Sequence, residues 1–160
     1  GLDADAVRRL GALGVLVRED AERLWERLRL SNEERSRLAS MAEGWRRITP
    51  SMAEHDARAL VYRLGPQLFT DRVLLAFARA GAEAADENWR RLAALPERWT
   101  APSFPLRADD FMQRGIAKGP RLGAALRRAE ETWIAQGFPL DQRALDRIAE
   151  AAARENGASV

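Results

Sequence analysis

Residues 102–138 have the sequence PSFPLRADDFMQRGIAKGPRLGAALRRAEETWIAQGF, and this stretch carries the clearest helical pattern of the chain. The dipeptide Gly119-Pro120 predicts the start of a long helix, because proline is favoured at a first helical position, where its missing N–H would have had no partner. A short helical segment near residues 107–114 and a turn over residues 115–119 are expected to precede this helix. Apolar side chains then recur at helical spacing and form one stripe, made of Leu122, Ala125, Leu126, Ala129 and Trp133.

An all-α fold is predicted, because the helical period recurs along the chain and no segment alternates with period two for long enough to make a strand. The groups with this period are Ala6, Leu10 and Leu13; Ala21, Leu24, Trp25 and Leu28; Leu38, Met41, Ala42 and Trp45; Ala57, Leu60, Val61 and Leu64; Val73, Leu74 and Phe77; Trp89, Leu92 and Ala93; and Leu145, Ile148, Ala149 and Ala152.

Capping residues, glycine and proline mark the expected ends of these helices. In a capping box, a Ser or Thr and a Glu three residues later satisfy each other's backbone donors. The predicted signals are a stop at Gly14, capping boxes at Ser31-x-x-Glu34 and Ser51-x-x-Glu54, a stop at Gly65-Pro66, a cap at Thr70-Asp71, and stops at Gly81 and Pro96.

A proline-bounded segment over residues 100–105 divides the chain. Pro102 and Pro105 disfavour helix at the residues that precede them, so the segment is predicted to be extended. We therefore expect two packed helical subdomains joined by this segment, residues 1–99 and residues 100–160, with the long helix in the second.

Composition excludes several classes of protein. With 46% hydrophobic residues, the 160-residue chain has enough apolar material for a core. It has no cysteine, which excludes disulfides, thiol catalysis and thiolate metal sites. No apolar run approaches the roughly 20 residues of a membrane span, and no signal peptide opens the sequence, so a cytoplasmic location is expected.

Basic residues are concentrated around the start of the long helix. The whole chain has a formal net charge of only +2, but the interval from Arg107 to Arg128 holds six basic residues against Asp109 and Asp110. Codon bias of a GC-rich genome and phosphate contact explain this arginine content equally well. Phosphate contact is one explanation because the forked guanidinium of arginine suits phosphate. Two interpretations of the helix start stay open, solvated cations or a phosphate grip on RNA. The residues concerned are Lys118, Gly119, Pro120 and Arg121, with Arg128 seven positions further on the same line of the helix and Arg127 and Arg114 nearby.

Three acidic motifs favour structural roles over catalysis. Asp3-x-Asp5 lacks the strand and Gly-Ser loop that accompany the Mg²⁺ carboxylates of nucleotidyl transfer, so it is predicted to lie at a helix start. His55-Asp56 lacks the further histidines of a metal phosphohydrolase, because the chain has a single His. The sequence shows no nucleophile turn beside that His, so it does not indicate a Ser-His-Asp triad either. Asp109-Asp110 is expected to cap a helix that begins near Phe111.

Tryptophan is common for a chain of this length, with five residues. Trp25, Trp45 and Trp133 lie on apolar stripes and are predicted to be core residues. Trp89 and Trp99 are less constrained by the pattern, and either could stack on a nucleobase or contact another domain.

Phe104-Pro-Leu, Asp110-Phe111, Gly115-Ile116, Gly119-Pro120-x-x-Gly123 and Trp133-Ile134 follow one another in this order. Together they resemble the C-terminal region of class II tRNA nucleotidyltransferases, the CCA-adding enzymes, and of the related bacterial poly(A) polymerases. The chain departs from the family pattern at Ala108, where the family usually has glycine. Upstream motifs resemble the α-proteobacterial branch of the family: Leu30-Ser31-Asn32-x-Glu34-Arg35, Ala59-Leu60-x-Tyr62-Arg63-Leu64-Gly65, Asp71-Arg72-x-Leu74-Leu75 and Leu95-Pro96-Glu97-Arg98-Trp99.

The resemblance implies that this region was excised from behind a catalytic head. That head would use Mg²⁺ with CTP and ATP to add nucleotides to an RNA 3′ end, so neither a cofactor nor a catalytic residue is expected in the region itself. The helical body and tail would hold a tRNA, which is the expected partner together with the chain's own N-terminal head. The alternative is a helical protein-interaction module that docks a partner domain without RNA contact.

Overall fold

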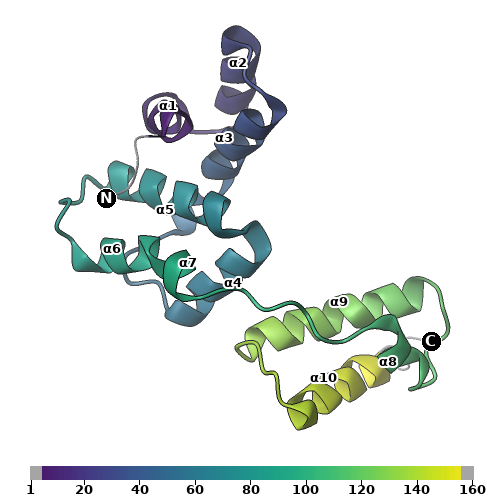
Figure 1. Ribbon diagram of the computed structural model, residues 1–160. Helices are drawn as coiled ribbons and strands as arrows, with labels where there is room; N and C mark the ends of the chain where they lie inside the picture. The colour runs from purple at the N-terminus through teal and green to yellow at the C-terminus, as the bar shows by residue number, and fades with distance from the viewer. Residues whose placement is uncertain (1–4, 156–160) are drawn as a thin grey trace. The chain divides into compact units, whose positions relative to one another are not determined.

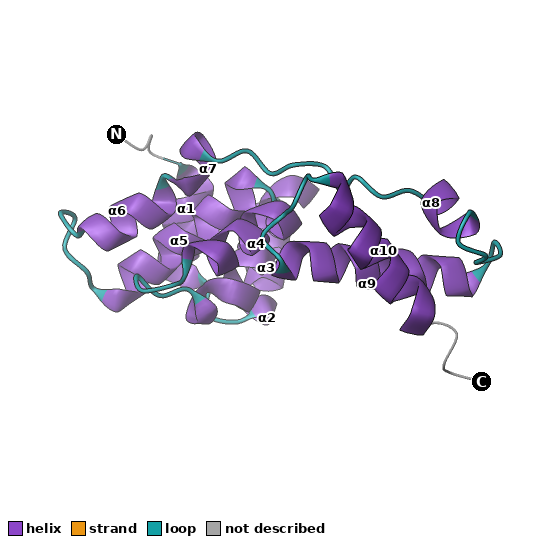
Figure 2. Ribbon diagram, turned by 90° about the horizontal axis from the view of Figure 1, so that it is seen from below, coloured by secondary structure: helices purple, strands orange, loops and turns teal. Residues whose placement is uncertain are grey.

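The structure is a computed structural model that describes residues 5–155 of the chain (Figure 1). Within this range the chain forms ten α-helices, one short 3₁₀-helix and no strand, as the helices and loops of Figure 2 show. The predicted all-α fold is therefore confirmed for the described part of the chain. Asp3, which is predicted to lie with Asp5 at a helix start, is outside the described residues. The tail after Glu155 is outside them as well.

The described chain divides into two compact units, with the boundary between Ala101 and Pro102. The first unit holds α1 (Ala6–Gly14), α2 (Arg18–Leu28), α3 (Asn32–Gly44), the 3₁₀-helix η1 (Trp45–Arg47), α4 (Glu54–Leu64), α5 (Pro66–Ala80), α6 (Glu87–Ala93) and α7 (Leu95–Arg98). The second holds α8 (Ala108–Met112), α9 (Pro120–Ala135) and α10 (Gln142–Glu155). Residues 99–107 form no helix, as the prolines predict for the segment over residues 100–105.

Helix α5 organises the first unit, because α1, α3, η1, α4 and α6 all pack against it. Two clusters of buried apolar side chains result. One is Ile48, Ala57, Val61, Phe69, Val73, Ala76, Trp89, Leu92 and Leu95, and the other is Val7, Val15, Ala21, Leu38, Met41, Ala42 and Leu75. The apolar stripes expected on the third, fourth and fifth helices supply many of these residues.

A buried carboxylate ties three helices of the first unit together. Asp71 of α5 is 0% exposed and accepts hydrogen bonds from Arg37 of α3 at 2.7 and 3.0 Å and from Nε of Arg8 of α1 at 2.7 Å. Arg37 also donates to Asp5 at 2.8 Å. The hydrogen bonds from Arg37 to Asp71 raise the pKa of this guanidinium above its ordinary value, against the opposing effect of burial.

The expected cap at Thr70-Asp71 is wrong. Helix α4 ends before Gly65, which has a φ of 79°. Helix α5 begins directly after it, at Pro66, four residues before Thr70. Proline at the first position has no N–H, so this helix start has one backbone donor fewer to satisfy. Thr70 Oγ1 instead donates to the Pro66 carbonyl at 2.9 Å, and Asp71 faces the core.

Of the two expected capping boxes, one is confirmed and one is wrong. Ser31 N donates to Glu34 at 2.7 Å, and Glu34 N donates to Ser31 Oγ at 3.2 Å. Helix α4, in contrast, begins at Glu54 after a cap residue, Ala53, that has no capping side chain. The Glu54 carboxylate accepts a hydrogen bond from Arg58 at 2.6 Å and lies 3.5 Å from Arg98. Similarly, Pro96 does not end the Trp89 helix, which stops at Ala93, but lies in the first turn of α7.

The buried face of α1 differs from the expected one. Leu13 is 86% exposed and Ala6 is exposed, whereas Val7 and Gly11 are buried. A Cβ at position 11 would lie 2.8 Å from Cε of Met41, so glycine is what lets α1 approach α3 this closely. Leu28, also expected in a core stripe, is exposed.

The second unit is a helical hairpin of α9 and α10, with α8 packed against both. The stripe predicted on α9 is buried at Leu122, Ala125, Ala129 and Trp133, and Leu126 is half-buried. Trp133 is fully buried, and its indole Nε1 donates to the Pro139 carbonyl at 2.8 Å, which satisfies its one polar atom. The stripe predicted on α10 is buried as expected, and Ala144 joins it.

We predict that Asp71→Asn destabilises the first unit by about 3–5 kcal/mol, because it removes the counter-charge of Arg8 and one of the two carboxylates that pair with Arg37. Urea denaturation followed by circular dichroism measures this. Arg90→Ala serves as the control, since it removes an exposed ion pair to Glu87 and should cost less than ~1 kcal/mol. Equal losses in the two variants would contradict the role given to Asp71.

The Asp5 carboxylate should contribute stability that depends on pH. Burial acts to raise its pKa, but hydrogen bonds from Arg37 and from the Arg8 backbone hold the pKa below the ordinary 3.8. A depressed folded-state pKa gives stability that is complete above 3.8 and is lost as the pH falls through the folded value.

Asp5→Asn keeps the ability to cap α1 but removes the charge. We expect roughly 1–2 kcal/mol lower stability at neutral pH and a shallower loss of stability below the ordinary pKa of aspartate than in the parent chain. Urea denaturation at a series of pH values measures both. Parallel curves for the two proteins would show that Asp5 does not contribute through its charge.

Candidate nucleic-acid interface

The loop between α8 and α9 brings the predicted site residues to one end of the second unit. After α8 the chain turns back, with Gly115 N donating to the Met112 carbonyl at 3.0 Å and Ile116 N to the Phe111 carbonyl at 3.1 Å. Gly115 has a φ of 86°, which favours glycine. The loop then ends at Gly119, and α9 begins at Pro120, as the sequence predicts.

A hollow of about 350 Å³ lies at this loop. It is lined by Arg114, Gly115, Ile116, Ala117, Lys118, Gly119, Pro120, Arg121 and, from α10, Ala153. Five of the seven residues predicted to contact RNA therefore line one concave surface. The other two, Arg127 and Arg128, lie further along α9 and do not line it.

The first turn of α9 uses some of its backbone donors internally. Pro120 has no N–H, and the N–H groups of Leu122 and Gly123 both donate to the Gly119 carbonyl, at 3.1 and 3.4 Å. The N–H groups of Leu122 and Gly123 are thus bonded within the helix start. Lys118 and Arg121 are exposed, and their charges add to the positive end of the α9 dipole.

Arg114 has a structural task besides lining the hollow. Its Nη1 donates to the Asp110 carbonyl at 2.7 Å, and its Nη2 lies 2.9 Å from Asp146 Oδ1. The side chain is 26% exposed. Because a carboxylate already neutralises this guanidinium, Arg114 fixes α8 and the loop to α10 and adds little positive potential to the hollow.

The two arginines outside the hollow differ in exposure. Arg127 is exposed on α9, and its guanidinium reaches back over Gly123, where an added Cβ would lie 3.6 Å from Nη1. Arg128 is half-buried, although the sequence suggested that it shares an outward line with Arg121.

The acidic motifs take structural positions. Asp5 caps α1 by accepting from Arg8 N at 2.9 Å, as predicted. Asp109 and Asp110 lie inside the first turn of α8, which begins at Ala108 and not near Phe111, so the expected cap is wrong in its position. The Asp110 carboxylate instead accepts from Arg107 N at 2.6 Å. Within residues 5–155 no group of three or more His, Asp or Glu side chains is placed to hold a metal ion.

The tryptophans only partly follow the prediction. Trp133 is a core residue as expected, but Trp25 and Trp45 are half-buried. Arg35 lies over the first of these rings, at 4.6 Å from its centroid, and Arg46 over the second, at 5.0 Å. Trp89, which the sequence left open to stack on a base, is only 5% exposed and packs edge-on against Phe77, so it belongs to the core.

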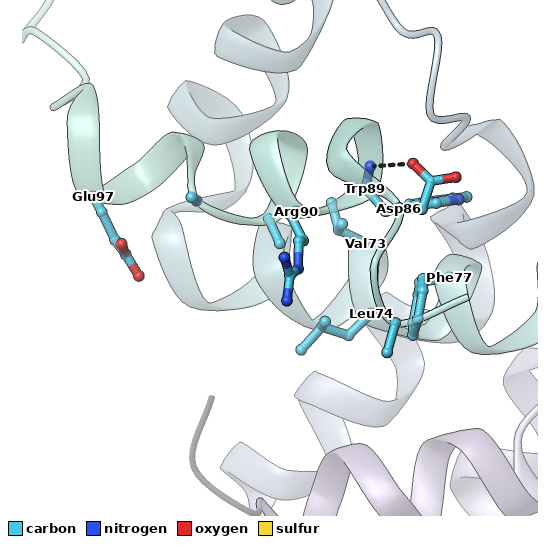
Figure 3. A pocket seen from close by; sticks show the side chains of 10 residues that line it. Val73, Leu74, Phe77, Asp86, Trp89, Arg90 and Glu97 are labelled. Atoms are coloured by element: carbon cyan, nitrogen blue, oxygen red, sulfur yellow. Dashed lines mark hydrogen bonds between the residues drawn. The ribbon is translucent and has the colours of Figure 1, made fainter. Parts of the chain in front are cut away.

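A second hollow, which sequence reasoning missed, lies in the first unit beside α5, α6 and α7 (Figure 3). Its volume is about 460 Å³, and its lining is mainly apolar: Val73, Leu74, Phe77, Ala84, Trp89, Ala93 and Ala94, with Asp86, Arg90 and Glu97. Asp86 is occupied in capping α6, because its carboxylate accepts from the backbone of Asn88 and Trp89. The small alanines of α6 and the preceding loop were the only sequence signal for this hollow.

Comparisons with known proteins leave the resemblance without independent support. No protein-family model matches the chain, and a comparison with curated proteins found no match either. None of the helices formed by residues 5–155 is both long enough and apolar enough to cross a membrane.

Replacing Gly119 by alanine should lower the stability of the folded chain. Its φ of 145° and ψ of −167° belong to a region that is essentially restricted to glycine, so Gly119→Ala should cost about 1–3 kcal/mol. Gly123→Ala is the matched control within α9, where the nearest atom to the new Cβ is at an ordinary 3.6 Å and helix propensity favours alanine by roughly 0.5–1 kcal/mol. Thermal unfolding should place the two variants on opposite sides of the parent chain, and the reverse order would contradict the backbone assignment.

Proposed function

We propose that this chain is the RNA-binding C-terminal portion of a tRNA nucleotidyltransferase or a related poly(A) polymerase. It holds the RNA, a tRNA, while a catalytic head N-terminal to it adds nucleotides to the 3′ end. The resemblance of ordered motifs between residues 16 and 138 suggests the family. The observation that carries the RNA-binding role is the basic hollow at the start of α9, where Lys118 and Arg121 are exposed beside the loop that Arg114 anchors.

In this proposal the two units are a body-like and a tail-like helical subdomain joined by the extended segment. The head binds Mg²⁺ and the nucleotides CTP and ATP, and it carries the catalytic carboxylates. The α9 end contributes electrostatic attraction to phosphate and ribose, which positions an RNA by its length and shape without distinguishing its bases. The chain alone is then inactive, and nucleotide incorporation into tRNA by the isolated chain would disprove this division of labour.

Fluorescence anisotropy of labelled tRNA across a salt series tests the proposal. Each phosphate contact releases counterions, so log K should fall by about 0.7–0.9 per contact for each log unit of salt. Lys118→Ala/Arg121→Ala should weaken binding roughly tenfold at low salt and reduce the slope by about one contact's value or more.

A matched control is available in the same unit. Arg143→Ala/Arg147→Ala removes two arginines of α10 that do not line the hollow, and it should leave affinity and slope unchanged. Salt-sensitive binding that survives the Lys118/Arg121 change would place the RNA surface elsewhere. The absence of tRNA binding at low salt would reject RNA binding by this chain on its own.

The apolar hollow beside α5 favours a second candidate function, a helical module that docks a partner domain. Leu74 and Phe77 are half-buried there although a core position was expected for both, and Figure 3 shows them on the α5 side of the hollow. Affinity for such a partner would depend little on salt, because apolar contact releases no counterions. Leu74→Gln would lower that affinity and leave tRNA binding unchanged.

A further inference from the structure

A second group of basic side chains lies in the first unit, where η1 packs against α5. Arg46 and Arg47 are exposed on η1, which follows directly on Gly44, the last residue of α3. Arg72 of α5 faces this junction, since the charge of Arg47 acts on it and its guanidinium lies against Gly44. The three arginines come from parts of the sequence that showed no basic excess.

The absence of a side chain at Gly44 makes room for the Arg72 guanidinium. A Cβ at this position would lie 2.6 Å from Cζ and 2.8 Å from Cδ of Arg72, so any other residue would displace that side chain. Nε of Arg72 donates to Ser40 Oγ at 3.0 Å, which fixes the direction of the guanidinium. Arg72 is thus held in one position by α3, although it belongs to α5.

Arg72 also lacks the counter-charge that comparable arginines have. Among residues 5–155 its guanidinium forms no ion pair, whereas other arginines that are at least partly buried meet a carboxylate, among them Arg8, Arg35, Arg37, Arg58 and Arg114. Burial lowers its pKa, which the charge of Glu43 opposes and that of Arg47 reinforces. Glu43 itself is paired with Arg18. A half-buried guanidinium without an anion is costly, and an anionic ligand would offset that cost.

We propose that Arg46, Arg47 and Arg72 form a phosphate-binding site on the first unit, with Gly44 and Ser40 positioning the central guanidinium. The arginines of this junction are Arg18, Arg46, Arg47 and Arg72, and Glu43 is the carboxylate that pairs with Arg18. The junction therefore carries a local excess of positive charge. The planar fork of arginine donates two parallel hydrogen bonds to phosphate oxygens, which suits this ligand better than a point charge would. The Arg46 guanidinium lies 5.0 Å from the centroid of the Trp45 ring, a cation–π contact.

The phosphate can come from an RNA backbone or from a free phosphate compound such as a nucleotide, and both present the same chemistry. The site does not depend on the α9 surface, because its residues all belong to the first unit. It therefore adds a second anion-binding surface to the one on which the proposed function rests.

Nuclear magnetic resonance of the arginine Nε–Hε groups tests the site directly in the full 160-residue chain. At constant ionic strength, inorganic phosphate or a short oligouridylate should shift the Arg72 signal in a saturable way. The signal is assigned by its disappearance in Arg72→Lys, which keeps the charge but not the fork. Gly44→Ala should reduce the shift, because the new methyl group displaces the guanidinium.

Arg46 and Arg47 are exposed, so replacing both of them does not remove any side chain from the core. Arg46→Ala/Arg47→Ala should weaken binding of labelled oligouridylate roughly tenfold at low salt and lower the salt slope by about 0.7 for each arginine–phosphate interaction that the variant removes. Arg9→Ala/Arg27→Ala removes two exposed arginines elsewhere in the first unit and is the matched control, with an expected change of less than about twofold.

The outcomes separate the possibilities. A shift of Arg72 with inorganic phosphate supports a site for free phosphate compounds, and a shift with oligouridylate alone supports an RNA-backbone site. An unmoved Arg72 signal, or equal weakening in the Arg9/Arg27 control, overturns the proposal. Lys118→Ala/Arg121→Ala, measured in parallel, distinguishes the two surfaces: loss of RNA binding only in that variant rejects this site and leaves the proposed function intact, and the converse result supports this site alone.

Discussion

The packing of the first unit depends on one carboxylate. Asp71 is fully buried, and a buried charge of this kind is tolerated only when other charges and hydrogen bonds compensate it. Arg37 and Arg8 provide that compensation from α3 and α1, so these two helices are tied to α5. Apolar packing alone would allow these helices to slide, whereas the fork geometry of the arginine–carboxylate contacts permits one arrangement. The second unit has no comparable buried ion pair among its described residues and relies on the apolar seam between α9 and α10.

The helical periods predicted the fold class and most helices, because apolar spacing is a local property of the sequence. Some signals that involve only neighbouring residues also held, among them the Ser31–Glu34 capping box and the Gly119-Pro120 helix start. Others, such as the capping box at Ser51 and the stop at Pro96, did not. A further kind of error came where a distant partner decides the outcome. Asp71 has the sequence appearance of a cap and is a core residue, because the arginines that neutralise it lie 34 and 63 positions away.

The candidate site was predictable to a similar degree. Local sequence placed Lys118, Gly119, Pro120 and Arg121 together, since they are consecutive, and the structure adds the hollow and its wall from α10. The sequence could not show which acceptor each basic side chain contacts. Arg114 is neutralised by Asp146, which is 32 positions away, whereas Arg72 donates to the hydroxyl group of Ser40 and forms no ion pair with any residue that the structure describes. Whether an arginine meets a carboxylate is thus set by tertiary contacts.

The distribution of tryptophan gives each unit its own optical signal. Four of the five tryptophans lie before Pro102, and Trp133 alone lies after it. Its ring is completely enclosed between Phe104 and Phe138, and its indole N–H is bonded to a carbonyl. Its emission therefore reports the state of the hairpin without interference once the other four are replaced by phenylalanine. The chain thus carries a built-in spectroscopic probe for asking whether its two halves melt together or one after the other.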